Sequence, residues 1–290
     1  MNVPVRADCT IAVSLEEPSI LQDGFDCRYG ESHPGTPRLS FHSPLVPPGS
    51  SFASLQTALG IRPATAWILD EIRALIDAAY ALPYPAPPQA LKLLRAMALE
   101  VHHRISHLPP SGPVRARMPP EPLSLLPSYP DFSASSRSSP PPSPFATPPC
   151  AELDPFYTAA RLAATLYAKA IATRRPLGEV CSEADALSVL TASWRIPLAR
   201  WRGMLGIFMW IMLSILPTVH RKTGKGNISA KLHTRLAKSI LQCGWMQMSL
   251  ENWTTCNESM QRALWFQRWL RQGARDDGWS QLIRGDEHKI

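Results

Sequence analysis

The feature that most constrains the fold is a charge-free apolar run of 16 residues, Met204–Val219, with the sequence MLGIFMWIMLSILPTV. Such a run must be removed from water, either in a membrane or among other helices. A membrane-spanning helix needs about 20 apolar residues, and Pro217 shortens this run further. Basic residues flank the run on both sides, so they indicate no orientation in a bilayer. We therefore expect a central helix from Trp201 to Leu216 that ends before Pro217 and is covered by neighbouring helices. A single-pass membrane anchor over 204–219 is the alternative.

Apolar residues at spacings of three and four predict further helices on both sides of this run. The expected helices span Pro63–Leu82, Pro88–His107, Pro155–Arg174, Ser182–Trp194, a segment after Asn227, and Leu250–Arg271. The first two are joined by a short proline-rich turn, which predicts a helical hairpin. No alternating strand pattern occurs, so the sequence predicts an all-α fold.

Prolines, 30 in all, divide the chain into ordered and disordered stretches. The Pro/Ser-rich stretch SASSRSSPPPSPFATPPC has too little apolar surface to offset its ordering entropy. We expect two helical blocks separated by this disordered insertion. The predicted units are a mostly disordered lead-in at 1–55 whose end packs on the next helices, a helical hairpin at 56–108, a disordered linker at 109–154, a helical block at 155–275 and a flexible tail at 276–290.

The six cysteines are too widely spaced for a binuclear zinc cluster. Such a cluster needs cysteines two and about six residues apart, so that six thiolates surround two metals. The closest pair here, Cys243 and Cys256, is 13 residues apart. We expect scattered reduced thiols in an intracellular protein, because the N-terminal sequence has no apolar signal run.

Three histidines, His102, His103 and His107, are the strongest candidates for a metal site. His103 and His107 share a helix face, but a stable site needs further ligands. We expect solvated histidines and no bound metal or cofactor. The sequence also contains no nucleophile elbow, phosphate-binding glycine loop or zinc-protease helix, so we expect no enzymatic activity.

Tryptophans and basic residues are concentrated in the second half of the chain. At helical spacing the tryptophans are expected in the core, each with its indole N–H bonded to a backbone carbonyl, although an aromatic pocket for a small effector is the alternative. From Arg195 to Arg275 there are 13 Lys or Arg and only two acids. This excess could contact phosphates or an acidic partner, but a solvated basic face is the expected interpretation.

Four segments together resemble the fungal-specific transcription factor domain, the helical region that follows the zinc cluster in many fungal regulators. These are RLSFHSPLVPPGSSFASLQTALGIRPATAWILDEIRAL at 38–75, RLAATLYAKAIATRRPL at 161–177, WRGMLGIFMWIMLSI at 201–215, and the tryptophan-bearing segment 253–269. They occur in the order that is typical of the family. The resemblance places six structural core residues, which are Leu69, Leu162, Trp201, Trp210, Trp253 and Trp265.

The resemblance implies a nuclear regulator whose helical domain binds other transcription regulators or a small-molecule effector. The DNA-binding zinc cluster of complete members has no counterpart here. We therefore expect no sequence-specific DNA binding by this chain alone, no membrane association, and a role as a regulatory partner.

Overall fold

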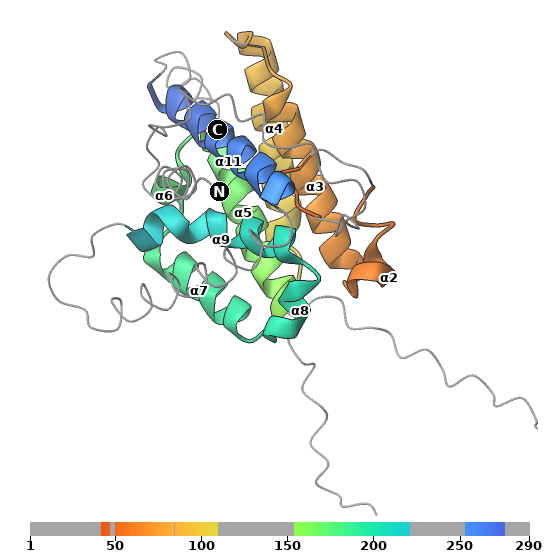
Figure 1. The fold of residues 1–290 in the computed structure, drawn as a ribbon. Coiled ribbons are helices and arrows are strands. Elements are labelled where there is room, and N and C mark those ends of the chain that lie inside the picture. The colour runs from red at the N-terminus through yellow and green to blue at the C-terminus, as the bar shows by residue number, and fades with distance from the viewer. Residues whose placement is uncertain (1–41, 47–49, 84, 110–153, 221–252, 276–290) are drawn as a thin grey trace, which may run out of the picture.

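The computed structural model describes residues 42–46, 50–83, 85–109, 154–220 and 253–275. Within these residues the chain forms helices and no strand, which confirms the expected all-α fold. The helices are α2 (Gln56–Leu59), α3 (Pro63–Tyr80), α4 (Pro88–Ser106), α5 (Pro155–Thr173), α6 (Leu177–Val180), α7 (Glu183–Trp194), α8 (Leu198–Arg202), α9 (Leu205–His220) and α11 (Trp253–Arg275) (Figure 1). The linker, the segment after Asn227 and the two terminal regions lie mostly or wholly outside the described residues.

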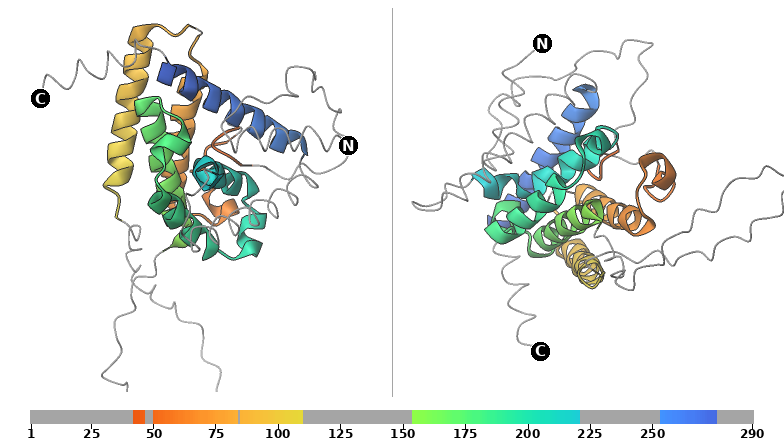
Figure 2. Two further views of the ribbon diagram at one scale, coloured as in Figure 1. Left: turned by 90° about the vertical axis from the view of Figure 1, so that its left-hand side faces the viewer. Right: turned by 90° about the horizontal axis from the view of Figure 1, so that it is seen from below.

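Helix α5 is the centre of the bundle. It packs against α3 and α4 on one side and against α6, α7 and α9 on the other (Figure 2). Its buried residues include seven alanines, Ala159, Ala160, Ala163, Ala164, Ala168, Ala170 and Ala172. Small side chains on several faces allow neighbouring helices to approach closely. The two helical blocks expected from the sequence thus share one hydrophobic core, and α3 packs against α4 as expected for a hairpin.

The apolar run forms α9, which is buried along its described length. The side chains from Met204 to Thr218 are buried, as expected for a central helix. No helix among the described segments is long and apolar enough to cross a membrane.

The expected boundaries of this helix were wrong at both ends. The segment from Trp201 forms two helices, α8 and α9, because the chain turns at Gly203 and Met204, where the Met204 N–H donates to the Trp201 carbonyl at 2.9 Å. At the other end Pro217 lies inside α9 rather than after it. Proline removes one helical hydrogen bond. Packing against α6 offsets this loss, since the Thr218 hydroxyl donates to the Cys181 carbonyl at 3.2 Å.

Two helix starts are explained directly by the sequence. Ser182 and Asp185 form a capping box at the start of α7, in which each side chain satisfies a backbone N–H at the other residue. Asp154 caps α5, because its carboxylate accepts the Phe156 N–H at 3.0 Å.

Candidate functional site

Five of the six residues placed by the family resemblance have described side chains, and all five pack in the core. Leu69, Trp201 and Trp210 are buried, whereas Leu162 and Trp265 are partly buried and pack against the same cluster. The sixth, Trp253, begins α11, and its side chain lies outside the described residues. The five described side chains therefore act as packing groups of one hydrophobic core.

Aromatic contacts connect the helices of the resembling segments. The Trp210 ring stacks on Tyr167 of α5 at 5.3 Å, and Tyr167 in turn lies 5.6 Å from Phe266 of α11. Complete burial raises the pKa of the Tyr167 hydroxyl, which donates to the Trp210 carbonyl at 3.3 Å. The expectation that every indole N–H bonds a carbonyl was wrong. Trp201 donates to the Ser193 carbonyl at 3.4 Å, but the buried N–H groups of Trp210 and Trp269 have no acceptor among the described residues.

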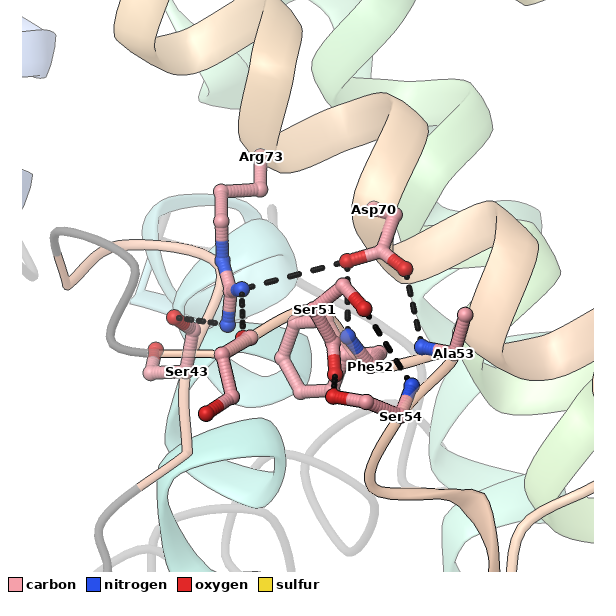
Figure 3. A network of polar contacts seen from close by, with 8 residues as sticks. Ser43, Ser51, Phe52, Ala53, Ser54, Asp70 and Arg73 are labelled. Carbon is pink, nitrogen blue, oxygen red and sulfur yellow. Dashed lines mark hydrogen bonds and ion pairs between the residues drawn. The ribbon is translucent and has the colours of Figure 1, made fainter.

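The end of the N-terminal lead-in is held against α3 by an acid and a base one turn apart. The Asp70 carboxylate accepts the backbone N–H groups of Phe52 at 2.8 Å and Ala53 at 3.0 Å (Figure 3). Arg73 donates to the carbonyls of Ser50 at 2.8 Å and Ser43 at 3.4 Å. We call these contacts the lead-in network. They satisfy backbone groups of a segment that has no regular secondary structure.

Burial lowers the pKa values of two basic groups at the lead-in network. Desolvation lowers the pKa of Arg73, while Asp70 and Asp77 act in the opposite direction. Desolvation also lowers the pKa of His42, and the positive charge of Arg73 lowers it further. The network therefore disfavours a second positive charge beside the lead-in.

A second arginine links the lead-in to α11. Arg262 donates to the Leu45 carbonyl at 3.0 Å and to the Asp77 carboxylate at 3.2 Å, and its guanidinium covers the ring of Tyr80 at 4.5 Å. Leu45 is fully buried. Residues 217 positions apart in the sequence are thus joined directly.

A third polar centre lies at the start of α5, where Asp154 is almost completely buried. Its carboxylate pairs with Arg62 at 3.1 Å and with Arg200 at 4.0 Å. Arg200 also donates to the Gly60 carbonyl at 3.1 Å. These contacts fix the turn between α2 and α3 against α5 and α8.

The second resembling segment meets the closing helix α11 at a close contact between Arg174 and Gly273. Arg174 has a positive φ of 49° and its guanidinium covers the Trp269 ring at 5.1 Å. A Cβ atom at Gly273 would overlap the Arg174 side chain. Only glycine at position 273 leaves room for this buried arginine.

Of the candidate metal histidines, His102 and His103 lie on α4 and His107 is the C-cap residue that follows it. The rings of His103 and His107 contact each other. The His103 and His107 ring centres are 4.1 Å apart, and His107 Nδ1 donates to the His103 carbonyl at 2.8 Å. His102 has a lowered pKa because of burial, with further contributions from Lys169 and His103. Among the described residues, no three His, Cys, Asp or Glu side chains are grouped so that they could hold a metal ion.

The basic segment and the cysteines can be placed only in part. Arg200 and Arg262 bind carbonyl and carboxylate oxygens of the protein itself, whereas most of the other basic residues lie outside the described residues. Cys181 is buried, and its thiol contacts the Ser182 carbonyl at 3.4 Å.

The structure adds an exposed apolar stripe on α7 that the sequence analysis missed. Trp194 is 61% exposed and Leu187 is 40% exposed. The two residues and the exposed Thr191 between them are four and three positions apart, so they follow one face of the helix. In the sequence the spacing indicates only that these residues share one face, and the structure shows that Val189 and Ala192 on the opposite face are buried. Trp194 is therefore an exception to the expectation that the tryptophans form the core.

Comparison of the chain with models of protein families, with curated proteins and with solved structures gives no match. The resemblance to the fungal-specific transcription factor domain therefore rests on the four sequence segments.

Proposed function

We propose that this chain is a regulatory partner in transcription that acts by binding another protein through the exposed stripe of α7. The observation that carries the proposal is the exposure of Trp194 beside Leu187 on a helix whose opposite face is buried. Tryptophan is the residue type most enriched at the energetic centres of protein interfaces. An exposed tryptophan on a rigid helix is preorganised for such a contact.

The partner that suits this stripe is an amphipathic helix of another transcription regulator. Glu183 and Leu187 are one helical turn apart on the exposed side of α7, and Trp194 lies two turns further along. A complementary helix has apolar residues opposite Leu187 and Trp194 and a basic residue opposite Glu183. The transcriptional role itself is supported by the resemblance of the four segments. In this proposal the partner supplies the zinc cluster and the DNA contacts, and the complex acts in the nucleus.

The test is nuclear co-purification of the full-length tagged chain from a fungal host, followed by binding of the purified chain to any recovered transcription regulator. The variants are Trp194→Ala and Leu187→Ala with Trp194→Ala. Met97→Ala, which removes an exposed apolar side chain from α4, is the matched control. We expect the α7 variants to weaken binding by tenfold or more, and the control to bind like the unchanged chain.

Two outcomes would overturn the proposal. One is recovery of the chain in membranes, which would favour the anchor over 204–219. The other is a recovered regulator that binds the double α7 variant as tightly as the unchanged chain. Thermal unfolding checks that the α7 variants are folded, because surface substitutions usually change stability by about 0.5 kcal/mol or less.

A further inference from the structure

Helix α4 has an exposed apolar face directly opposite its core face. It lies at the edge of the bundle, beyond α3 and α5 (Figure 2). Leu94, Ala98, Val101 and Ile105 of α4 are buried. On the other side Leu93 is 65% exposed and Leu99 is 49% exposed, with the exposed Ala96 between them. The outer face thus combines two large apolar side chains with one small residue at its centre.

The charges on this face are arranged symmetrically about Ala96. Lys92 lies four residues before Ala96 and Glu100 lies four residues after it, and both are exposed. Leu93 and Leu99 are likewise three residues before and after Ala96. With about 3.6 residues per turn, positions three and four residues from Ala96 lie on the same side of the helix as Ala96. The face therefore becomes its own complement when a copy of the helix is turned end to end.

A two-fold axis through Ala96 would bring the complementary residues of the two copies together. It would place Lys92 opposite Glu100 of the second copy and Leu93 opposite Leu99 of the second copy, with the two pairs repeated by symmetry. The small Ala96 side chain would let the two helices approach closely at the crossing point. Glu100 also pairs with Arg104 of its own helix at 3.4 Å, but its side chain is 66% exposed, so its carboxylate is accessible to a second cation.

We propose that the chain self-associates as a two-fold symmetric dimer through antiparallel contact of α4 with α4 of a second copy. This surface is separate from the α7 stripe, so the dimer goes beyond the proposed regulatory function and can be tested independently of it. A contact limited to one helix pair lies at the lower end of the range for specific interfaces, which starts at about 1,200 Å². We therefore expect a dimer whose population depends on concentration in the micromolar range.

The decisive experiment is sedimentation equilibrium of the full-length chain with charge exchanges on α4. Lys92→Glu places two acids opposite each other across the dimer, and Glu100→Lys places two bases opposite each other. We expect each single variant to weaken dimerisation by tenfold or more. The double variant, Lys92→Glu with Glu100→Lys, restores opposite charges across the axis, and we expect it to recover most of the association.

A second pair of variants locates the contact. Ala96→Arg brings two arginines together at the axis and should give a monomer. Thr191→Arg, on the exposed stripe of α7, should leave the dimer unchanged. The proposal is overturned by a chain that remains monomeric at high micromolar concentration, by a double charge exchange that fails to recover association, or by a dimer lost in Thr191→Arg but kept in Ala96→Arg. Circular dichroism of each variant confirms that the helices are retained.

Discussion

The guanidinium of Arg73 lies 4.0 Å from the centre of the Phe52 ring, so that a cation on α3 covers the fully buried aromatic side chain that anchors the lead-in. The same guanidinium binds the carbonyls of Ser43 and Ser50. One side chain therefore combines a cation–π contact with two charge-assisted hydrogen bonds. Among the described residues, the segment that Arg73 holds forms no helix or strand. Arg73 therefore supplies hydrogen bonds that a neighbouring helix or strand residue would otherwise supply to the backbone carbonyls of this segment.

Replacing Arg73 by methionine should destabilise the protein by about 2–3 kcal/mol. Methionine keeps much of the aliphatic volume but leaves the carbonyls of Ser43 and Ser50 without their charged donor, and a hydrogen bond to a charged group contributes about 1.5–3 kcal/mol. Urea unfolding monitored by tryptophan fluorescence measures the change. Arg104→Met is the matched control, because Arg104 pairs with Glu71 on the surface and such pairs contribute about 1 kcal/mol or less. Equal losses in the two variants would contradict a special role for Arg73.

The capping box of α7 provides a second prediction. Ser182→Ala removes the hydroxyl that accepts the Asp185 N–H at 3.1 Å, and we expect a loss of about 1 kcal/mol. Ser188→Ala is the control, because its hydroxyl donates to a carbonyl of the same helix, and alanine is the better helix former. Thermal unfolding should therefore show a lower midpoint for Ser182→Ala and an unchanged or slightly higher one for Ser188→Ala. A higher midpoint for both would show that the box contributes nothing.

The contact between Arg174 and Gly273 predicts energetic coupling between two distant segments of the chain. Gly273→Ala should destabilise the protein by about 1–3 kcal/mol, because the new Cβ displaces the buried Arg174 side chain. Arg174→Gly removes that side chain and suits the positive φ at this position. We expect Gly273→Ala to cost much less in the Arg174→Gly background. A double-mutant cycle measures this coupling. Additive changes in the free energy of unfolding would show that the two residues do not interact.

The pattern of apolar residues predicted most of the fold. The 3.6-residue periodicity located α3, α4 and α5, each of which begins at a proline, to within two residues, since these signals are local. The break between α8 and α9 and the helical position of Pro217 were missed, because long-range packing against α6 and α5 decides them. Whether Trp194 faces the core or solvent also depends on where α7 lies relative to α5, which the periodicity of α7 alone does not specify.

The lead-in network shows the same division between local and long-range information. The sequence indicated that the lead-in packs on the neighbouring helices, and residues 42–46 and 50–55 do so through Leu45 and Phe52. The partners Arg73 and Arg262 were not predicted, because the pairing of Arg262 with the Leu45 carbonyl spans 217 residues. Charged side chains that bind carbonyl groups of distant segments have no sequence spacing by which to recognise them.

The histidine pKa values predict that stability falls as the solution becomes acidic. The pKa values of His42 and His102 are lowered from 6.5 in the folded protein, so the unfolded chain binds more protons than the folded chain just below pH 6.5. Unfolding free energy rises with pH wherever the unfolded state binds more protons. Above about pH 6.5 these histidines are neutral in both states and cost no unfolding free energy. As the pH falls towards their folded-state pKa values, protonation of the unfolded chain lowers the unfolding free energy.

His42→Gln should reduce this pH dependence, because glutamine beside Arg73 has no proton to gain. Urea unfolding of the unchanged chain, His42→Gln, His102→Gln and the double variant at several values between about pH 5 and 7.5 measures the slope that each histidine supplies. We expect the double variant to have the shallowest slope in this range. A slope that stays the same after both substitutions would assign the acid sensitivity to other groups and would contradict the charge conflict between His42 and Arg73.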